Sequence, residues 1–462
     1  GMECAPCMLE PRMDEVLHSD NIDLLTLSEV ESVVGFFGNF DISIRRRARY
    51  VVADACFGCS ACFEPCPVRV PNEYNEGMDQ RGAIFVPYAG ALPNVPAVDT
   101  ANCLRFRGEE CTACEAACGF GAIDFSQKDE LLERKYGAVL VATGLGVFDC
   151  SALPSLGYGK SENVITSLEL ERIVSTTGPT GGEIRKSDGA PPARVVFIQC
   201  AGSRDPSAAP YCSGVCCMDS LKLAHAIREN VDGASASVIY SDLCVPGLEG
   251  QGFCDSAIDH GVRLLQCADM KSVSVESAEG GLSVSYTASS GEKVTETADM
   301  VVLSPAIIPG PDTGSIARLF SLDLDPNGFI PGMHDRLDPA CTRVKGVYAA
   351  GCVGGPADVR GSVMQAKAAA GEVLSVLVPG EKLEVEAITT YIDEGLCSGC
   401  RICNTLCPYK AISYDEEKGV SRVNELLCRG CGTCAAACPS GAAVSRHFDR
   451  GQIYAEITGV LS

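Results

Sequence analysis

The chain has 462 residues, 28 cysteines and a formal net charge of −23. This length fits about three domains, and disulfide-rich secreted proteins are usually much shorter, so we expect the thiols to be reduced or metal-bound in a cytoplasm. The negative charge argues against nucleic acid and anionic membranes as direct partners, and no apolar run is long enough to predict a membrane-spanning helix.

Residues 1–53 contain few cysteines, and one alternating segment, Phe40–Ile44, predicts a strand. Cys4 and Cys7 form an isolated CxxC pair. Such a pair is often only redox-active or structural, but it is also half of a common metal-binding set. Two interpretations therefore stay open: a thiol pair without metal, and half of a metal site completed by residues outside this chain.

Residues 54–127 carry a cysteine spacing that occurs twice in the chain. The pattern CxxCxxCxxxCP is followed by a second group of cysteines. This is the run of bacterial two-cluster ferredoxins, in which the fourth cysteine of the run ligates the other cluster. It predicts two [4Fe-4S] clusters. The first is assigned to Cys56, Cys59, Cys62 and Cys118, and the second to Cys66, Cys103, Cys111 and Cys114.

This module departs from a minimal ferredoxin in two ways. The gap between Cys103 and Cys111 is longer than the usual two residues, so we expect Cys103 on an enlarged loop. A proline-rich insertion, residues 71–97, separates the two halves. Structural zinc and disulfides are the alternatives to clusters. Zinc sites usually use two CxxC pairs rather than one continuous run, which favours clusters.

Residues 128–385 alternate short apolar runs with helical patterns, which predicts a doubly wound α/β sheet. We expect buried strands at residues 138–142, 195–198, 237–240 and 300–303. Residues 282–287 and 293–297 alternate around Gly291 and predict a hairpin. Helices are expected at residues 218–229 and 363–377.

Two segments of this domain are similar to flavin-binding elements of two-dinucleotide-domain flavoproteins. One is the Ala-Thr-Gly turn after the strand at residues 138–142, and the other is the strand, loop and helix at residues 346–366. A helix N-terminus facing the flavin would favour its anionic reduced form. An ordinary strand–turn–helix packing unit is the alternative. The candidate FAD contacts are Thr143, Gly144, Gly351, Cys352, Ser362 and Val363.

The dinucleotide fingerprint GxGxxG does not occur in the sequence. The strand predicted at residues 194–200 runs into Cys200-Ala-Gly-Ser instead of a glycine-rich phosphate loop. We therefore expect no NAD(P) site in the central domain. The first strand and helix of the FAD domain are also missing from the sequence, and two interpretations stay open: a neighbouring polypeptide supplies them, or the chain is a shortened form of a longer one.

Residues 386–462 repeat the cysteine spacing of the first module, which predicts two further [4Fe-4S] clusters. A short strand is expected in the tail at residues 452–457. The third cluster is assigned to Cys397, Cys400, Cys403 and Cys438, and the fourth to Cys407, Cys428, Cys431 and Cys434.

Taken together, the chain resembles the HdrA family, the iron–sulfur flavoproteins of heterodisulfide reductase, over essentially its whole length. The resemblance rests on residues 4–16 (CAPCMLEPRMDEV), 34–40 (VGFFGNF), 70–73 (VPNE), 199–205 (QCAGSRD) and 211–218 (YCSGVCCM). It implies an α/β, thioredoxin-reductase-like two-dinucleotide-domain flavin fold with an inserted and a C-terminal bacterial-type (α+β) ferredoxin domain. Residues 1–53 are then a flavin-domain fragment, 54–127 the inserted ferredoxin domain, 128–385 the main flavin domain and 386–462 the C-terminal ferredoxin domain.

The resemblance also implies a fifth [4Fe-4S] cluster. Spacing alone does not predict it, because adjacent cysteines rarely bind one cubane. A group of small buried residues at a strand end is the alternative. The implied ligands are Cys200, Cys212, Cys216 and Cys217. The chain departs from the family at two points: related flavoproteins often have Asp at Cys352, and family members usually carry the flavin fingerprint upstream of the segment that begins here.

The function implied by the resemblance is that of an oxidoreductase subunit that passes electrons between FAD and several clusters, in flavin-based electron bifurcation or its reverse. Implied partners are heterodisulfide-reductase-like B and C subunits, hydrogenase or formate dehydrogenase modules, ferredoxin, and a polypeptide that supplies GxGxxG. A passive iron–sulfur relay is the alternative. A flavin reductase similar to the small subunit of glutamate synthase is disfavoured by the absent nucleotide fingerprint. No residue is a clear nucleophile or acid–base catalyst, so the chemistry belongs to the cofactors.

Overall fold

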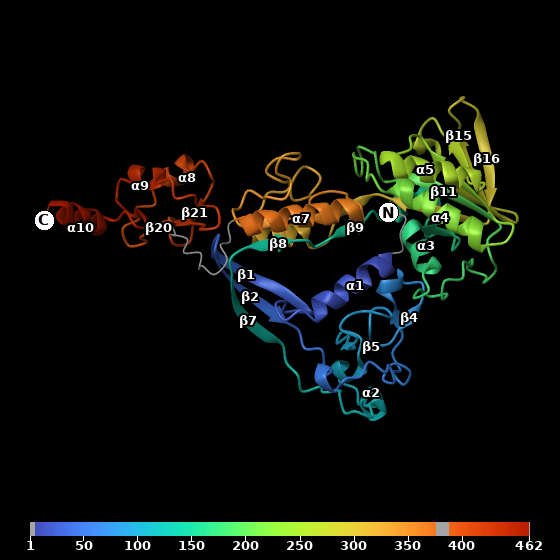
Figure 1. The fold of residues 1–462 in the computed structure, drawn as a ribbon, viewed down its shortest axis with the longest axis horizontal. Helices are drawn as coiled ribbons and strands as arrows, with labels where there is room; N and C mark the ends of the chain where they lie inside the picture. Colours follow the sequence, from blue (N-terminus) through green and yellow to red (C-terminus); the bar gives the residue numbers. More distant parts are fainter. Residues whose placement is uncertain (1–4, 376–387, 462) are drawn as a thin grey trace.

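The computed structural model describes residues 5–375 and 388–461. Its largest unit contains a five-stranded parallel sheet in the order β10–β17–β11–β12–β13, at the right of Figure 1. Three of the buried strands predicted from apolar runs lie in this sheet, which confirms the predicted parallel α/β sheet. The doubly wound arrangement is wrong, because helices cover one face of the sheet and an antiparallel sheet covers the other. The strands are β10 (Val164–Thr166), β11 (Arg194–Ala201), β12 (Ser235–Tyr240), β13 (Arg263–Gln266) and β17 (Met300–Pro305).

Both faces of the parallel sheet are covered, as strands with continuous apolar runs require. On one face, Phe197 of β11 packs against Leu221 of the longest covering helix, and neither side chain is exposed to solvent. The opposite face packs against an antiparallel sheet that contains the predicted hairpin. The covering elements are α3 (Ser167–Val174), α4 (Cys216–Asn230), α5 (Gly247–Asp259), β14 (Ser274–Ala278), β15 (Gly281–Thr287) and β16 (Lys293–Ala298).

A second, three-stranded antiparallel sheet joins segments from both sides of the first ferredoxin module. β1 (Ser28–Phe36) pairs with β2 (Asn39–Arg46), and β2 pairs with β7 (Glu130–Tyr136). The intervening residues form the module that lies below this sheet in Figure 1, so the module is an insertion in the chain. α1 (Ala5–Leu17) precedes the sheet. The structure describes only the backbone of Cys7, and Cys4 lies outside the described residues, so the CxxC hypothesis stays a prediction.

The strand predicted at residues 138–142 is not part of the large sheet. It forms β8 (Val139–Val141), which pairs in parallel with β19 (Val347–Ala349). Next to it, β9 (Leu145–Val147) pairs with β18 (Ile307–Pro309). Two helices complete this region: α6 (Thr313–Leu319) packs under the antiparallel β1–β2–β7 sheet in one apolar core, and α7 (Val359–Ser375) lies along β8 and β19.

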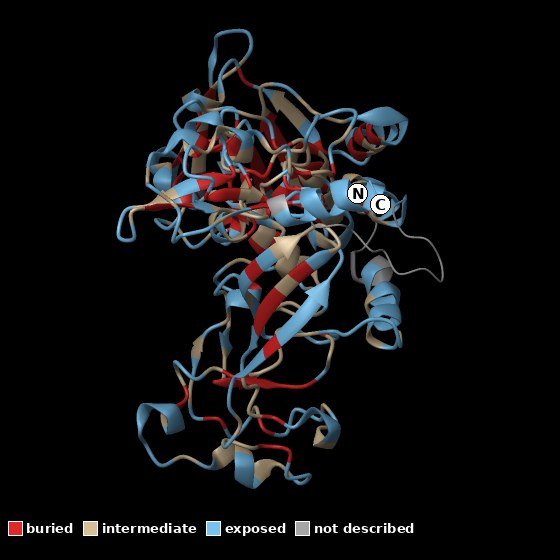
Figure 2. Ribbon diagram, turned by 90° about the vertical axis from the view of Figure 1, so that its left-hand side faces the viewer, coloured by how far each residue is buried: buried red, intermediate tan, exposed pale blue. Residues whose placement is uncertain are grey.

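The two ferredoxin modules are small and built from very short elements. Buried residues are densest in the α/β unit, and the first module, at the bottom of Figure 2, is mostly exposed. The strands of the first module are β3 (Val70–Pro71), β4 (Gln80–Arg81), β5 (Ile84–Phe85) and β6 (Ala97–Val98), with helix α2 (Ala113–Ala117). The second has β20 (Thr390–Ile392), β21 (Ile412–Asp415), β22 (Val420–Val423) and β23 (Ala443–Ser445), with α8 (Ile402–Leu406) and α9 (Thr433–Ala437).

Single 3-10 turns occur in the first module and in the α/β region. They are η1 (Ala53–Ala55), η2 (Glu73–Asn75), η3 (Leu104–Arg107), η4 (Cys150–Ala152), η5 (Pro154–Leu156), η6 (Met270–Ser272) and η7 (Gly351–Val353).

The strand predicted in the tail at residues 452–457 is wrong, because this segment lies in a helix, α10 (Arg450–Leu461). The β-branched residues suggested a strand, yet Ile453, Ile457 and Leu461 recur every four residues, which is a helical period. Asp449 caps the helix: its carboxylate accepts from the Gln452 backbone N–H at 3.0 Å, and the Gln452 side chain accepts from the Asp449 N–H at 3.2 Å.

Among the described residues, no helix has both the length and the apolar character needed to cross a membrane.

Candidate metal centres and flavin site

The first module brings together the thiols that the spacing assigns to each cluster. One cavity is lined by Cys56, Cys59, Cys62 and Cys118. A second cavity is lined by Cys66, Cys103, Cys111 and Cys114. The fourth cysteine of the run, Cys66, thus lines the cavity of the second group, and Cys118 lines that of the first. This exchange is the arrangement that a two-cluster ferredoxin requires.

The chemistry of the two cavities fits a metal cluster. Burial raises the pKa of the Cys62 thiol to about 11, and the nearby thiol of Cys114 adds to this shift. Burial likewise raises the pKa of Cys114 to about 11. A buried group of thiols resists ionisation unless a metal compensates the negative charge, and ligation by iron does this. The two cavities are adjacent, because Cys62 of one and Cys114 of the other belong to the same apolar core.

Backbone geometry supports this fit. The Gly58 N–H points to Cys56 Sγ at 3.4 Å, and the Ala122 N–H points to Cys118 Sγ at 3.3 Å. Such bonds to ligand sulfurs tune cluster potentials. Gly82 faces Cys66, and a Cβ at this glycine would stand 3.3 Å from its Sγ. Throughout residues 5–375 and 388–461, no three His, Cys, Asp or Glu side chains are grouped as ligands of a single metal ion.

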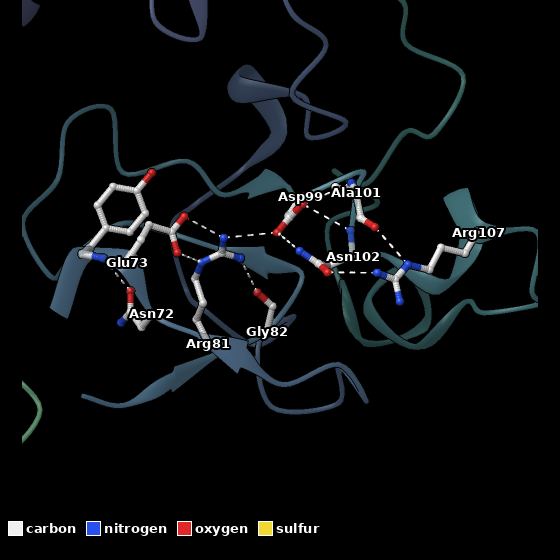
Figure 3. Close-up of polar contacts among 9 residues, drawn as sticks. Asn72, Glu73, Arg81, Gly82, Asp99, Ala101, Asn102 and Arg107 are labelled. Carbon is white, nitrogen blue, oxygen red and sulfur yellow. Dashed lines mark hydrogen bonds and ion pairs between the residues drawn. The ribbon is translucent and has the colours of Figure 1, made fainter. Parts of the chain in front are cut away.

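The enlarged loop that carries Cys103 is held by a polar network (Figure 3). Arg81, on β4, makes two hydrogen bonds of 2.7 Å with the Glu73 carboxylate and one of 3.1 Å with Asp99. Asp99 accepts from the Asn102 side chain at 2.9 Å, and Asn102 accepts from Arg107 at 3.0 Å. The proline-rich insertion therefore fixes the loop on which Cys103 lies.

We expect Arg81→Ala to loosen the second cluster of this module. The substitution leaves the half-buried Asp99 carboxylate without its cation, which costs about 1–3 kcal/mol. Iron should leave the purified variant several times faster in the presence of a chelator. Arg134→Ala is the control, because this arginine on β7 bonds only to a neighbouring carbonyl. Equal iron release from both variants would show that the network does not support the cluster.

In the C-terminal module, the structure groups one of the two predicted ligand sets in a single cavity. That cavity is lined by Cys407, Cys428, Cys431 and Cys434. The Ala411 N–H points to Cys407 Sγ at 3.3 Å, as Ala122 does to Cys118 in the first module. The remaining set is distributed over the loop before α8, α8 itself and the end of α9, and its grouping stays a prediction. These residues are Cys397, Cys400, Cys403 and Cys438.

The central domain brings the four family-implied thiols to the same edge of the parallel sheet. Cys200 lies on β11, at the carboxyl end of the strand, and Cys216 and Cys217 form the first turn of α4. Burial raises the pKa of Cys216 to about 12 and that of Cys217 to about 11, and the thiol of Cys200 contributes to both shifts. Cys212 contacts Cys200 and Cys217. Cys217 is buried, Cys200 and Cys216 are half-buried and Cys212 is exposed, and the fifth cluster stays a prediction.

The loop after β11 is conformationally strained. Cys200 and Arg204 both have positive φ, at 57° and 58°, which is rare for residues other than glycine. Gly202, with φ +77°, lies against the Phe148 ring, where a Cβ would come within 2.4 Å of the ring. Backbone strain of this kind concentrates at functional sites. The loop replaces the glycine-rich turn that a nucleotide-binding sheet has at this edge.

Arg204 was not predicted from the sequence as part of this site. Its guanidinium interacts with the thiols of Cys200 and Cys212 and forms a 2.7 Å ion pair with Asp242. The same edge of the sheet has a cavity of about 370 Å³, lined in part by Cys200 and Arg204. Two further charged groups of this cavity form an ion pair, since Lys271 lies 3.1 Å from Asp205.

We expect Arg204→Ala to lower the reduction potential of the central cluster by about 50–100 mV, because a nearby positive charge favours the more negative, reduced state. Potentiometric titration followed by electron paramagnetic resonance measures the shift. Lys271→Ala removes the same charge from the same cavity but not from beside the thiols of Cys200 and Cys212, with which Arg204 interacts, so its shift should be smaller. A potential unchanged in Arg204→Ala would remove this residue from the site.

The six candidate flavin contacts lie at the carboxyl ends of β8 and β19 and at the start of α7. The Gly351 N–H donates to the Gln365 side chain at 2.7 Å, and Ser362 Oγ lies 3.5 Å from where a Gly351 Cβ would stand. The Cys352 thiol is buried and donates to the Ala357 carbonyl at 3.2 Å. Thr143, Gly144 and Val363 are exposed or half-buried. The structure thus groups these residues, and their contact with FAD stays a prediction.

Comparisons with known proteins identify one family model and several relatives that the chain is similar to. Residues 396–442 match the family described as a 4Fe-4S dicluster domain. The chain is 42% identical, over 99% of its length and 70% of the relative, to the iron–sulfur A subunit of the CoB–CoM heterodisulfide reductase of Methanocaldococcus jannaschii. It is 37% identical, over its full length and 70% of the relative, to the A subunit of the H2/formate:CoB–CoM heterodisulfide,ferredoxin reductase of Methanococcus maripaludis.

Among solved structures, the thioredoxin reductase of T. acidophilum aligns with 63% of this chain and 84% of its own, at 16% identity and a TM-score of 0.33. The sequence relatives cover the whole length of the chain, both cysteine-rich modules included. The chain therefore belongs to the HdrA family, the iron–sulfur A subunits of heterodisulfide reductase, which are oxidoreductase subunits.

Proposed function

We propose that this chain is an electron-transfer subunit of a heterodisulfide-reductase-like complex, working between FAD and several [4Fe-4S] clusters. The observation that carries the proposal is the exchange of ligands in the first module, where Cys66 and Cys118 each line the cavity of the opposite group. Two adjacent four-thiol cavities serve single-electron transfer. In such a protein the clusters supply one-electron steps and FAD supplies exchange of an electron pair.

The protein's own residues would hold and tune these cofactors. Buried thiols such as Cys62, Cys66 and Cys103 supply ligands and keep water away from the metal. Backbone N–H groups that point at ligand sulfurs adjust the potentials. In the central domain, Arg204 adds a positive charge beside two thiols.

The flavin would lie at the carboxyl ends of β8 and β19. The parallel pairing of these strands supports this placement, because ligands of doubly wound sheets lie at that edge. The first turn of α7 begins there, with the Gly361 N–H donating to the Asp358 carboxylate at 2.6 Å. The pyrophosphate would need a GxGxxG segment, which these 462 residues do not contain, so we propose that the residues described form only part of the FAD site.

We further propose that the complex performs flavin-based electron bifurcation or its reverse. The support is positional: one ferredoxin module is inserted between β2 and β7, and the other lies beyond α7, so each can face a different partner (Figure 1). The proposed partners are B and C subunits, hydrogenase or formate dehydrogenase modules, and ferredoxin. Names of relatives that mention hydrogen, formate and ferredoxin support this choice.

A passive iron–sulfur relay is the second candidate, favoured by the absent fingerprint. An acceptor-omission assay on the purified complex separates the two. In bifurcation, reduction of the low-potential acceptor should stop when the high-potential acceptor is omitted. A relay would reduce each acceptor whether or not the other is present, and that outcome would overturn the bifurcation proposal.

A further inference from the structure

A fifth thiol lies at the edge of the sheet where the central cluster is proposed. β11 and β12 are neighbouring parallel strands, so the loops that follow them emerge at the same edge. Cys200 is at the end of β11, and Cys244 lies in the loop after β12. The next residue, Val245, packs in the same apolar core as Met218 of α4, which holds this loop against the helix that carries Cys217.

Cys244 contacts two of the proposed cluster ligands. Its thiol forms a hydrogen bond with the Cys212 thiol. Its backbone N–H donates to Cys217 Sγ, and the two thiols also interact electrostatically. Cys217 therefore interacts with the thiols of Cys200, Cys212 and Cys244.

Cys216 has different surroundings. Its thiol points to the Pro305 carbonyl at 3.7 Å and also bonds to Ser213. Neighbouring residues of an α-helix point about 100° apart, so Cys216 and Cys217 approach a common cluster from different sides. Cys244 lies on the side of Cys217. A thiol at that position can reach the iron atom that Cys217 would bind.

We propose that Cys244 is a reserve ligand of the central cluster, able to take the place of Cys217 at one iron. In this exchange the iron–sulfur bond to Cys217 breaks and one to Cys244 forms. The proton of the Cys244 thiol passes to the Cys217 sulfur, and no electron is gained or lost. The inference rests on the proposed central cluster and extends it from four thiols to five.

The test is the iron content and the reduced-state electron paramagnetic resonance spectrum of the full chain, purified without oxygen. Wild type and Cys217→Ala should both contain about 20 iron atoms, and the double variant Cys217→Ala/Cys244→Ala should contain about 16. Cys217→Ala/Cys254→Ala is the matched control, because Cys254 is a buried thiol in the middle of α5. This control should contain as much iron as Cys217→Ala does. Cys216→Ala should lose about four irons, since Cys244 lies on the wrong side to replace it.

The outcomes separate this inference from the proposed function. A wild-type chain with about 16 irons would overturn the central cluster itself. If the wild-type chain contains about 20 iron atoms and the Cys217→Ala variant about 16, only the reserve-ligand proposal is overturned. Equal iron content in Cys217→Ala and in the double variant would overturn it too. If Cys217→Ala does not fold, Cys217→Ser gives the same comparison. The reduced-state electron paramagnetic resonance spectrum of Cys217→Ser should then be that of a cluster with four thiolate ligands. This spectrum should change when Cys244 is also replaced.

Discussion

Cys431→Ala is expected to block electron transfer to the partner at the C-terminal module while the flavin of the complex can still be reduced through the other module. Cys431 lines the cavity of the fourth predicted cluster, and no other thiol lines it besides Cys407, Cys428 and Cys434 in the described part of the chain. Loss of the cluster raises the activation free energy of electron transfer along this path by several kcal/mol. Because each ~1.4 kcal/mol changes a rate tenfold, the rate of transfer should fall about 100-fold or more.

Stopped-flow reduction of the flavin in the variant complex measures this effect with each donor in turn. Cys59→Ala is the matched variant, since Cys59 is likewise an exposed thiol that lines a predicted cluster cavity, in the first module. The two variants should block opposite paths. If Cys431→Ala prevents flavin reduction from every donor, the modules form one linear wire and the branched arrangement is wrong.

The isolated chain is expected to retain less than about a tenth of an equivalent of FAD, because the pyrophosphate of a dinucleotide normally lies on the N-terminus of the helix that GxGxxG opens. The sequence has no such segment. The candidate contacts Thr143, Gly351 and Ser362 would hold the flavin end of the cofactor and leave its pyrophosphate without a binding segment. Gel filtration of the reconstituted chain, followed by flavin fluorescence of the protein peak, measures retention.

The complementary experiment adds the polypeptide that carries GxGxxG. FAD should then remain with the assembly, and Ser362→Trp should reduce its retention by filling the space beside Gly351. The variant Ser315→Trp is the control, at an exposed position on α6. Stoichiometric FAD on the isolated chain through gel filtration would show that no second polypeptide is needed.

Much of the fold follows from local patterns. The buried strands around Phe197, Val238 and Val302 were predicted because continuous apolar runs are typical of parallel strands covered on both faces. The hairpin around Gly291 was predicted from alternation. The helix in the tail was not predicted, because Ile453 and Ile457 favour strands by residue type while their spacing is helical. The order of strands in the sheet also could not be predicted, since it depends on contacts between distant segments.

The same division holds for the site. The ferredoxin ligands could be assigned because the cysteine spacing alone determines which thiols share a cluster, and two cavities in the first module and one in the second contain the expected sets. Arg204 and Cys244 could not be assigned. Arg204 reaches the thiols through a strained turn, and Cys244 reaches them only because β11 and β12 are neighbours.

The central claim is that the assigned cysteines hold five cubane clusters in one chain. Anaerobic determination of iron and acid-labile sulfide in the purified protein tests it most directly. The account predicts about 20 iron atoms and about 20 sulfides per chain, with no stoichiometric zinc. About 16 irons or fewer, or zinc in place of iron, would contradict it, because at least one of the five assigned clusters would then be absent.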